Sequence, residues 1–302
     1  MSAAVKVLRV KRVFDGADQV HRSIAADRRK GPAEPPAKLR ARFSVREQEV
    51  AGRRVYLVGP QDHPTTRHVL YLHGGGWVLS IMPPHWTLVG QLVEQLDCTV
   101  IVPLYPLAPE HSAQDVLAML LPFYAQTAAE VGARNLTVMG DCTGGNVALS
   151  LAMQARDRKL PQPARLVLIS PTLDATFTDP AIPALDRTDP ILSRRGAPEV
   201  ARLYAGELDV RDPMISPIFG SLEGLAPLAV FTGTRDILNA DAHQLKDKAA
   251  RARIPLAWFE YPGMLHVWLL FPIPEARRAI RQIAEFVLDE TVADLPGTTA
   301  NA

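Results

Sequence analysis

Short apolar runs alternate with longer stretches of helical character along most of this chain. Residues 100–102 and 166–169 are apolar at every position, which is typical of strands buried on both faces. Strands that alternate with helices form a mostly parallel sheet covered on both sides, so we expect an α/β fold. The predicted strands are residues 68–72, 99–104, 136–140, 164–170, 228–232 and 256–261, and the predicted helices lie near residues 86–96, 113–131, 145–158, 239–252 and 275–290.

Two parts of the chain depart from this alternation. Residues 41–58 read as a hairpin, because strand-like runs at residues 43–50 and 54–58 flank an Ala-Gly turn. Residues 172–221 contain several prolines and favour only one helix, and so long an irregular segment is usually a lid or a binding loop. We therefore expect one domain over residues 1–302, with a cap formed by residues 1–40 and 172–221 over the carboxyl edge of the sheet. The alternative is a surface excursion that only packs on the core.

Composition narrows the classes of partner. The formal charge of +1 gives no electrostatic reason to expect nucleic acid or an acidic surface as partner. Two cysteines in 302 residues do not suggest a disulfide framework. Basic residues interrupt the apolar positions near the N-terminus, so no signal peptide is expected, and no uncharged apolar run is long enough for a membrane span. These features favour a soluble, cytoplasmic protein.

The strongest local motif surrounds Cys142. A strand-like run at residues 135–139 leads into Gly-Asp-Cys-Thr-Gly at residues 140–144, and a helix-like run follows at residues 146–152. A strand, a sharp turn and a helix form a nucleophile elbow, of pattern G-x-S-x-G, here with cysteine in place of serine. Glycines flank the tip because the nucleophile is held in a strained backbone conformation that crowds its neighbours. The sequence therefore predicts Cys142 as a catalytic nucleophile.

Acyl transfer at such an elbow also needs donors for the developing oxyanion. His-Gly-Gly-Gly at residues 73–76 directly follows a predicted strand, and its glycines expose backbone N–H groups. We expect the N–H groups of Gly75 and Gly76, joined by that of Thr143 at a helix N-terminus, to form the oxyanion hole. His73 is expected to shape this loop rather than to transfer protons.

The base and the acid that orients it are expected after the nucleophile, each at the end of a later strand. Asp236 follows the strand at residues 228–232, although a helix N-cap is the alternative interpretation. Asp241 is a second candidate for the acid, but it falls within the following helix and is expected to face solvent. His266 follows the strand at residues 256–261 and completes the order nucleophile, acid, base.

The remaining candidates have weaker signals. Trp77 and Trp268 neighbour the oxyanion loop and the base, so we expect them to bind substrate, with core packing as the alternative. Cys98 is expected to be a buried small hydrophobic residue, and the basic stretch from Arg28 to Arg42 a solvated face. The histidines lack the spacing of a metal site, and no phosphate-binding glycine loop or dinucleotide fingerprint is present, so we expect no metal and no cofactor.

Together these motifs resemble the hormone-sensitive-lipase family of α/β-hydrolases, a group of microbial carboxylesterases and lipases. The resemblance implies an α/β-hydrolase fold with an eight-stranded sheet and a helical cap. It also implies hydrolysis of small acyl esters by a nucleophile–His–Asp triad, and a homodimer, for which the strand at residues 256–261 is the candidate edge. The resemblance runs from about residue 40 to residue 290 and is carried by residues 73–76, 105–111, 140–145, 212–217 and 263–266.

The departures from the family pattern bear on the chemistry. Thr143 replaces the usual alanine, Ile237 replaces a common proline and Val267 replaces a common glycine. The replacement of serine by Cys142 matters most, because a thiol is far more acidic than a hydroxyl. A thiolate–imidazolium pair is the expected resting state, and the acyl intermediate becomes a thioester.

Three interpretations follow from this replacement. The favoured one is a carboxylesterase that uses Cys142 as its nucleophile. The second is an altered or engineered serine esterase of low activity, or one that traps its acyl group. The third is a non-enzymatic small-molecule-binding protein on the same fold, like the gibberellin receptors, which resemble this family but lack the base histidine. Because His266, Asp236 and the glycine loop are all retained, turnover is the expectation.

Overall fold

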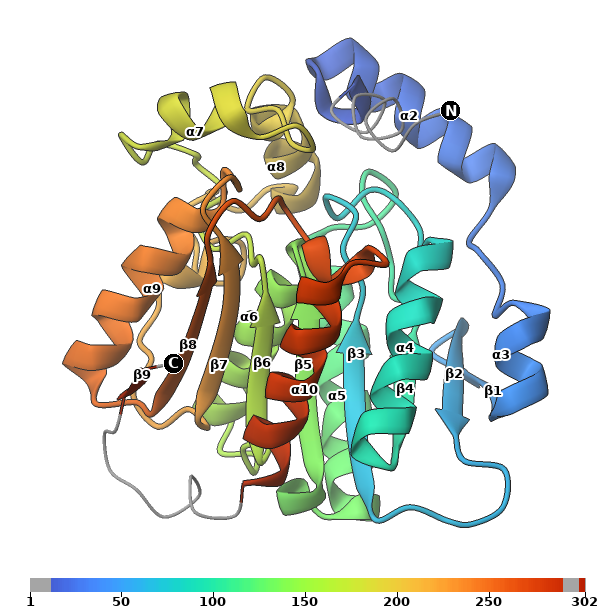
Figure 1. The fold of residues 1–302 in the computed structure, drawn as a ribbon. Coiled ribbons are helices and arrows are strands. Elements are labelled where there is room, and N and C mark those ends of the chain that lie inside the picture. The colour runs from blue at the N-terminus through green and yellow to red at the C-terminus, as the bar shows by residue number, and fades with distance from the viewer. Residues whose placement is uncertain (1–11, 290–298, 302) are drawn as a thin grey trace.

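The computed structural model describes residues 12–289 and 299–301, and its centre is a twisted sheet (Figure 1). The strand order is β1-β2-β4-β3-β5-β6-β7-β8-β9. β1 pairs with β2 and β2 with β4 in antiparallel fashion, and all other neighbours are parallel. The strands are β1 Ser44–Val50, β2 Arg53–Gly59, β3 Arg67–Leu72, β4 Cys98–Pro103, β5 Leu136–Asp141, β6 Arg165–Ile169, β7 Leu228–Gly233, β8 Leu256–Tyr261 and β9 Thr299–Asn301.

Helices cover both faces of this sheet. α4 and α10 pack together on one face, and α5, α6 and α9 cover the other. β6 is buried at every residue, as its apolar run at residues 166–169 predicts, and the neighbouring β5 is buried at every residue too. The α-helices are α2 Ala17–Lys30, α3 Ala37–Arg42, α4 Pro83–Leu96, α5 Ala113–Val131, α6 Thr143–Asp157, α7 Ile182–Thr188, α8 Ala197–Ala205, α9 Asn239–Ala252 and α10 Pro274–Leu288, and the 3-10 helices are η1 Arg12–Phe14, η2 Ala133–Asn135, η3 Pro217–Phe219 and η4 Trp268–Leu270.

The predicted architecture is confirmed, with one addition. The eight expected strands form a mostly parallel sheet, and the hairpin is β1 and β2. The short β9 pairs with β8 at Leu256–Trp258. The strand expected to lie at the edge of the sheet is therefore partly covered, which corrects the edge proposed for a homodimer. None of the helices in the described residues is long and apolar enough to cross a membrane.

α2, α7 and α8 lie beyond the carboxyl ends of the parallel strands (Figure 1). α2 contacts α8, so the N-terminal segment and residues 172–221 meet above the sheet. Two details of the expectation are corrected. Residues 172–221 contain a second helix, α7. The sequence pattern does not predict it, because Pro183 and polar residues interrupt its apolar positions. α3 packs beside the sheet against α4 and β1 rather than over the carboxyl edge.

Candidate active site

Cys142 stands at the turn between β5 and α6, and its backbone has the strained conformation of an elbow. Its φ is +52° and its ψ is −122°. The turn is closed by a hydrogen bond from the Cys142 N–H to the Ile169 carbonyl, at 2.8 Å. A Cβ at Gly144 would lie 2.0 Å from the Leu72 carbonyl oxygen, and one at Gly140 would lie 2.2 Å from that of Gly144. The flanking glycines are therefore required by the close approach of β3, β5 and α6.

The imidazole of His266 connects the elbow to a buried carboxylate. Its Nδ1 lies 3.0 Å from Asp236 Oδ2, and the two side chains are almost completely buried. Burial alone would lower the pKa of His266, but the charge of Asp236 and the interaction with Cys142 raise this pKa well above its ordinary value. Asp236 and Cys142 thus outweigh the effect of burial on the pKa of this ring.

Two further side chains hold this arrangement, and the sequence reasoning missed both. Asp189, in the segment that follows α7, accepts hydrogen bonds from the N–H groups of Ile237 at 2.9 Å and Ile191 at 2.7 Å. Burial and the nearby Asp236 raise the pKa of Asp189. Ser170, at the end of β6, accepts a hydrogen bond from the N–H of Val267 at 3.1 Å. The cap segment and β6 thus fix the residues that directly follow Asp236 and His266.

The glycine loop after β3 lies beside the elbow. Gly75 and Gly76 have φ values of +137° and +64°, and within the described chain no acceptor bonds their N–H groups. The N–H of Gly74 is bound by Asp141 Oδ1 at 3.0 Å, and the Tyr71 hydroxyl donates to the same oxygen at 2.5 Å. Asp141, the residue before the nucleophile, therefore anchors the loop and leaves two adjacent N–H groups free to bind an oxyanion.

Thr143 ties the loop to the elbow in a way that alanine could not. Its Oγ1 accepts a hydrogen bond from the N–H of Trp77 at 3.2 Å, and its side chain is buried. The N–H of Thr143 belongs to the first residue of α6, where helix geometry leaves N–H groups without partners inside the helix. The expectation that Gly75, Gly76 and Thr143 form an oxyanion hole stays a prediction.

Replacing Thr143 by valine is expected to lower kcat/KM for a short acyl ester roughly tenfold. Valine keeps the shape but loses the acceptor, and an unmade buried hydrogen bond costs about 1–3 kcal/mol, where 1.4 kcal/mol is tenfold. Thr143→Ser keeps the hydroxyl and should retain most of the activity. Steady-state kinetics on all three proteins measure this difference. If Thr143→Val and Thr143→Ser behave alike, the bond to Trp77 does not position the loop.

A small cavity of about 40 Å³ lies beside Cys142. It is small against the ~300–1,000 Å³ of ordinary ligand pockets, and the Cys142 side chain is only 8% exposed. The cap therefore closes over the sulfur in this structure. Besides Cys142, the side chains that line the cavity are mostly apolar and come from the cap, the elbow and the loop after β7: Phe14, Trp77, Thr143, Thr172, Phe177, Leu192, Ser193, Ala197, Val200, Ile237 and Leu238.

The two tryptophans have different positions. Trp77 lines the cavity and stacks on Tyr204 of α8 with ring centroids 4.7 Å apart. Trp268 is fully buried, packs against Tyr261 and does not line the cavity, which corrects the expectation that it binds substrate. Its apolar ring surface is used by the core between β8 and α10.

His73 and Cys98 lie where the sequence predicts. The Nδ1 of His73 bonds the Gly74 carbonyl at 2.8 Å, its ring stacks on Tyr105, and burial lowers its pKa to about 4, so it is a neutral part of the loop. Cys98 is fully buried, and burial raises the pKa of its thiol to about 12. In the described residues no cluster of His, Cys, Asp or Glu could hold a metal ion.

Asp241 does not face solvent, which corrects the expectation for this residue. It is fully buried, and its Oδ2 accepts hydrogen bonds from the N–H groups of Leu173 at 2.8 Å and Asp174 at 3.0 Å. These residues begin the cap segment, next to Thr172, whose Oγ1 lies 3.9 Å from the Cys142 sulfur. The turn of α9 that carries Asp241 faces the cap rather than water, and helical periodicity alone could not show this.

The stability of Asp241→Asn relative to the parent is expected to increase as the pH rises. Burial raises the pKa of Asp241 to about 8 from the ordinary 3.8, so the folded chain holds a proton that the unfolded chain loses. This group therefore lowers the stability of the parent progressively between about pH 4 and pH 8. Asparagine keeps an oxygen acceptor for the two N–H groups and cannot ionise. Thermal unfolding at both ends of this range measures the effect, and a difference in Tm that is independent of pH would contradict it.

Arg28, the first residue of the basic stretch, is not part of a solvated face. This corrects the expectation for that residue. Its guanidinium donates to the carbonyls of Val78 and Ala108, each at 2.8 Å, and pairs with Glu110 at 2.8 Å. The neighbouring Arg29 is exposed. The arginine therefore anchors α2 to the loop that follows the three glycines.

Comparison with known proteins agrees with this geometry. Residues 69–270 match a family described as having the alpha/beta hydrolase fold, and an esterase of Acinetobacter venetianus is 30% identical over 73% of this chain and 74% of its own. A structure of EstE5 soaked with p-nitrophenyl butyrate has a TM-score of 0.81 at 26% identity, covering 97% of this chain and 99% of its own. A structure of an esterase from the bacterial hormone-sensitive lipase family has a TM-score of 0.81 at 25% identity, covering 95% and 98%.

The chain belongs to the α/β-hydrolases, in the group that resembles hormone-sensitive lipase. The fold and family expected from the sequence are confirmed. It is an enzyme of the esterase and lipase type, a carboxylic ester hydrolase.

Proposed function

We propose that this protein is a carboxylesterase in which Cys142 forms a covalent acyl-enzyme, with His266 as base and Asp236 as the group that orients it. The observation that carries the proposal is the position of the His266 ring. It bonds Asp236 at 3.0 Å and interacts with Cys142, beside a loop with unbonded N–H groups at Gly75 and Gly76. Nucleophile, base, orienting acid and oxyanion donors are the parts that acyl transfer requires.

In the first half-reaction the thiolate of Cys142 attacks the ester carbonyl. A carbon–sulfur bond forms, and the carbonyl electron pair moves to the oxygen, where the N–H groups of Gly75, Gly76 and Thr143 stabilise the charge. Collapse of this intermediate breaks the bond to the alcohol oxygen, which takes the proton from the His266 imidazolium. The products are a free alcohol, a neutral imidazole and an acyl thioester on Cys142.

In the second half-reaction water attacks the thioester. His266 removes a proton from the water as the carbon–oxygen bond forms, and Asp236 stabilises the imidazolium that results. The tetrahedral intermediate then expels the Cys142 thiolate and releases the carboxylic acid. The enzyme returns to its thiolate–imidazolium state with no cofactor or metal in the cycle.

The substrates we infer are small acyl esters. The cavity of about 40 Å³ beside Cys142 favours a short acyl chain, and Phe14, Leu192 and Ile237 make its lining apolar. The related EstE5 has been soaked with p-nitrophenyl butyrate, an ester with a short acyl chain that is suitable as an assay substrate here. Longer esters require the cap helices to move apart, a motion that commonly gates hydrolases. α2, α7 and α8 are accordingly proposed as the cap.

An altered serine esterase remains the second candidate, because the elbow and the loop have the geometry expected around a serine. The Thr143 hydroxyl and the glycines at 140 and 144 would serve an oxygen nucleophile equally well. The intact pair of His266 and Asp236 favours turnover over the ligand-binding alternative.

Iodoacetamide is expected to alkylate Cys142 at mildly acidic pH and to leave Cys98 unmodified. The thiolate is the reactive species. A sulfur beside an imidazolium remains nucleophilic, whereas the pKa of about 12 keeps Cys98 protonated. Peptide mapping by mass spectrometry identifies the modified residue, and the esterase rate should fall in parallel with modification of Cys142. Equal reactivity of the two thiols in the folded protein would refute an activated Cys142.

A further inference from the structure

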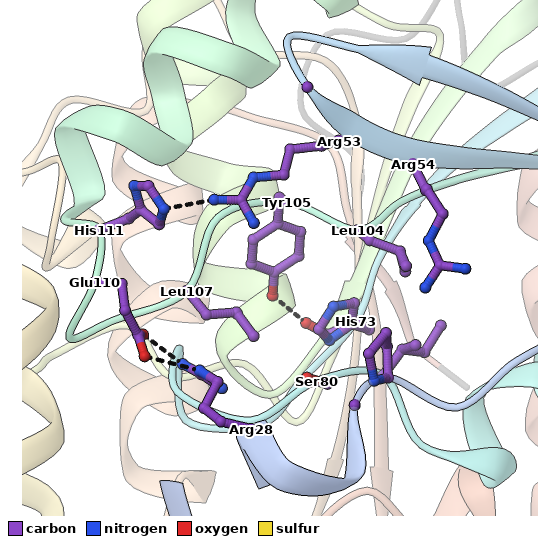
Figure 2. A pocket seen from close by; sticks show the side chains of 14 residues that line it. Arg28, Arg53, Arg54, His73, Ser80, Leu104, Tyr105, Leu107, Glu110 and His111 are labelled. Carbon is purple, nitrogen blue, oxygen red and sulfur yellow. Dashed lines mark hydrogen bonds and ion pairs between the residues drawn. The ribbon is translucent and has the colours of Figure 1, made fainter. Parts of the chain in front are cut away.

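A second cavity, of about 410 Å³, lies beside His73, the residue that precedes the glycines of the oxyanion loop. Its walls come from the end of α2, the hairpin of β1 and β2, and the loop between β4 and α5 (Figure 2). It shares no lining residue with the catalytic cavity. Its volume falls in the range of ordinary small-molecule sites, whereas the catalytic cavity is far smaller.

The charged side chains around this cavity are unequal in number. Arg28, Arg53 and Arg54 line it, and Glu110 is its one lining carboxylate in the described residues. Glu110 pairs with Arg28 at 2.8 Å, and Arg54 pairs at 2.6 Å with Glu34, outside the lining. Arg28 also pairs with Asp27 at 2.9 Å, so the charges of Arg28 and Arg54 are balanced by carboxylates.

Arg53 is the lining arginine whose charge is not balanced in this way. Within the described residues no carboxylate forms an ion pair with it, and its Nη2 lies 2.5 Å from Nε2 of His111. A guanidinium can only donate, so the imidazole nitrogen accepts, and the remaining guanidinium donors stay available. Figure 2 shows both side chains at the rim of the cavity, with Tyr105 beside them. A carboxylate or phosphate at this point would neutralise Arg53 and accept from its free N–H groups.

The wall below Arg53 is apolar. Ile81, Leu104 and Leu107 line the cavity together with the ring of Tyr105, whose hydroxyl is already bonded to the His73 carbonyl. A cation at the rim and apolar side chains below it suit a ligand with an anionic head and an apolar portion. An inorganic anion would leave the apolar wall unused.

We propose that this cavity is a second ligand site, which binds a small organic anion through Arg53 and packs its apolar portion against Leu104 and Leu107. The site is independent of the acyl-transfer chemistry, because it contains none of the groups assigned to that reaction. His73 lines its inner wall and directly precedes the three glycines of the oxyanion loop. A bound anion would therefore touch the segment that carries Gly75 and Gly76.

Calorimetric titration with octanoate tests this site. The parent protein should bind octanoate, and Arg53→Gln should weaken binding at least roughly tenfold, because hydrogen bonds to charged groups contribute about 1.5–3 kcal/mol. Arg211→Gln is the matched control, since Arg211 stacks on Phe219 and lies outside the cavity lining. It should bind octanoate as the parent does. Arg53→Lys keeps the charge and should lose less affinity than Arg53→Gln.

If octanoate binds in the catalytic cavity instead, its affinity will not depend on Arg53. Equal affinities of the parent and Arg53→Gln would therefore overturn the proposal. An absence of octanoate binding would overturn it too. Inorganic phosphate is the second probe and should bind at least roughly tenfold more weakly than octanoate, because it has no apolar portion. Phosphate binding as tight as that of octanoate would overturn the assignment of an organic anion. Thermal unfolding of each variant verifies that the hairpin stays folded.

Discussion

Cys142→Ala is expected to lower kcat/KM for p-nitrophenyl butyrate by about four orders of magnitude. Alanine removes the proposed nucleophile, while the oxyanion loop and the cavity remain. The turn between β5 and α6 already holds this residue at a strained φ of +52°, so the alanine variant should fold in the same way as the parent. Steady-state kinetics and thermal unfolding, measured together, separate lost chemistry from lost structure.

Cys142→Ser is the matched control for this prediction. Serine restores a nucleophile at the elbow, and we expect this variant to retain or raise the rate on short p-nitrophenyl esters. If Cys142→Ser is inactive while the parent turns over, the site is tuned to sulfur and the altered-serine-esterase interpretation fails. If Cys142→Ala keeps the parent rate, Cys142 is not the nucleophile.

His266→Ala is expected to lower kcat/KM by about three orders of magnitude in the parent and in Cys142→Ser alike. General acid–base catalysis contributes about 10²–10⁴-fold, and His266 serves both half-reactions in the proposed cycle. The loss should fall on kcat more than on KM, because the ring transfers protons in the transition states rather than binding the ester. In the parent, which has the cysteine, His266→Ala also removes the positive charge proposed to stabilise the thiolate.

His243→Ala is the control for this second prediction. His243 is a half-exposed histidine of α9 that pairs with Glu260 at 2.7 Å, away from the elbow. Its replacement should leave the esterase rate unchanged. An unaffected rate in His266→Ala would remove His266 from the proposed triad and would leave the burial of the Asp236 carboxylate without a catalytic explanation.

Much of this arrangement could be predicted from the sequence, because its motifs are local. A strand, a turn and a helix around Cys142 are fixed by neighbouring residues, and the steric need for Gly140 follows from the same few residues. The need for Gly144 comes instead from Leu72 of β3. The strand ends that carry Asp236 and His266 could be predicted for a similar reason. In a parallel sheet the carboxyl ends of the strands meet at one edge, so strand order brings distant residues together.

The cap residues could not be predicted, because their roles depend on contacts between distant segments. Asp189 lies in an irregular stretch, and only the fold shows that it binds the N–H of Ile237. Arg28 and Asp241 sit on helices whose polar positions suggested solvent, but each faces another segment of the chain. Polar side chains of this kind are held away from water by hydrogen bonds to backbone groups, and such partners leave no local pattern.

Transfer of an acyl group to the Cys142 sulfur can be measured directly. Rapid acid quenching of the protein during turnover of p-nitrophenyl butyrate, followed by peptide mass spectrometry, should find a butyryl thioester on Cys142 that hydroxylamine removes. The same experiment on His266→Ala should show much slower acylation. Steady turnover by the parent with no butyryl group on Cys142, or with the group on another residue, would contradict a cysteine acyl-enzyme.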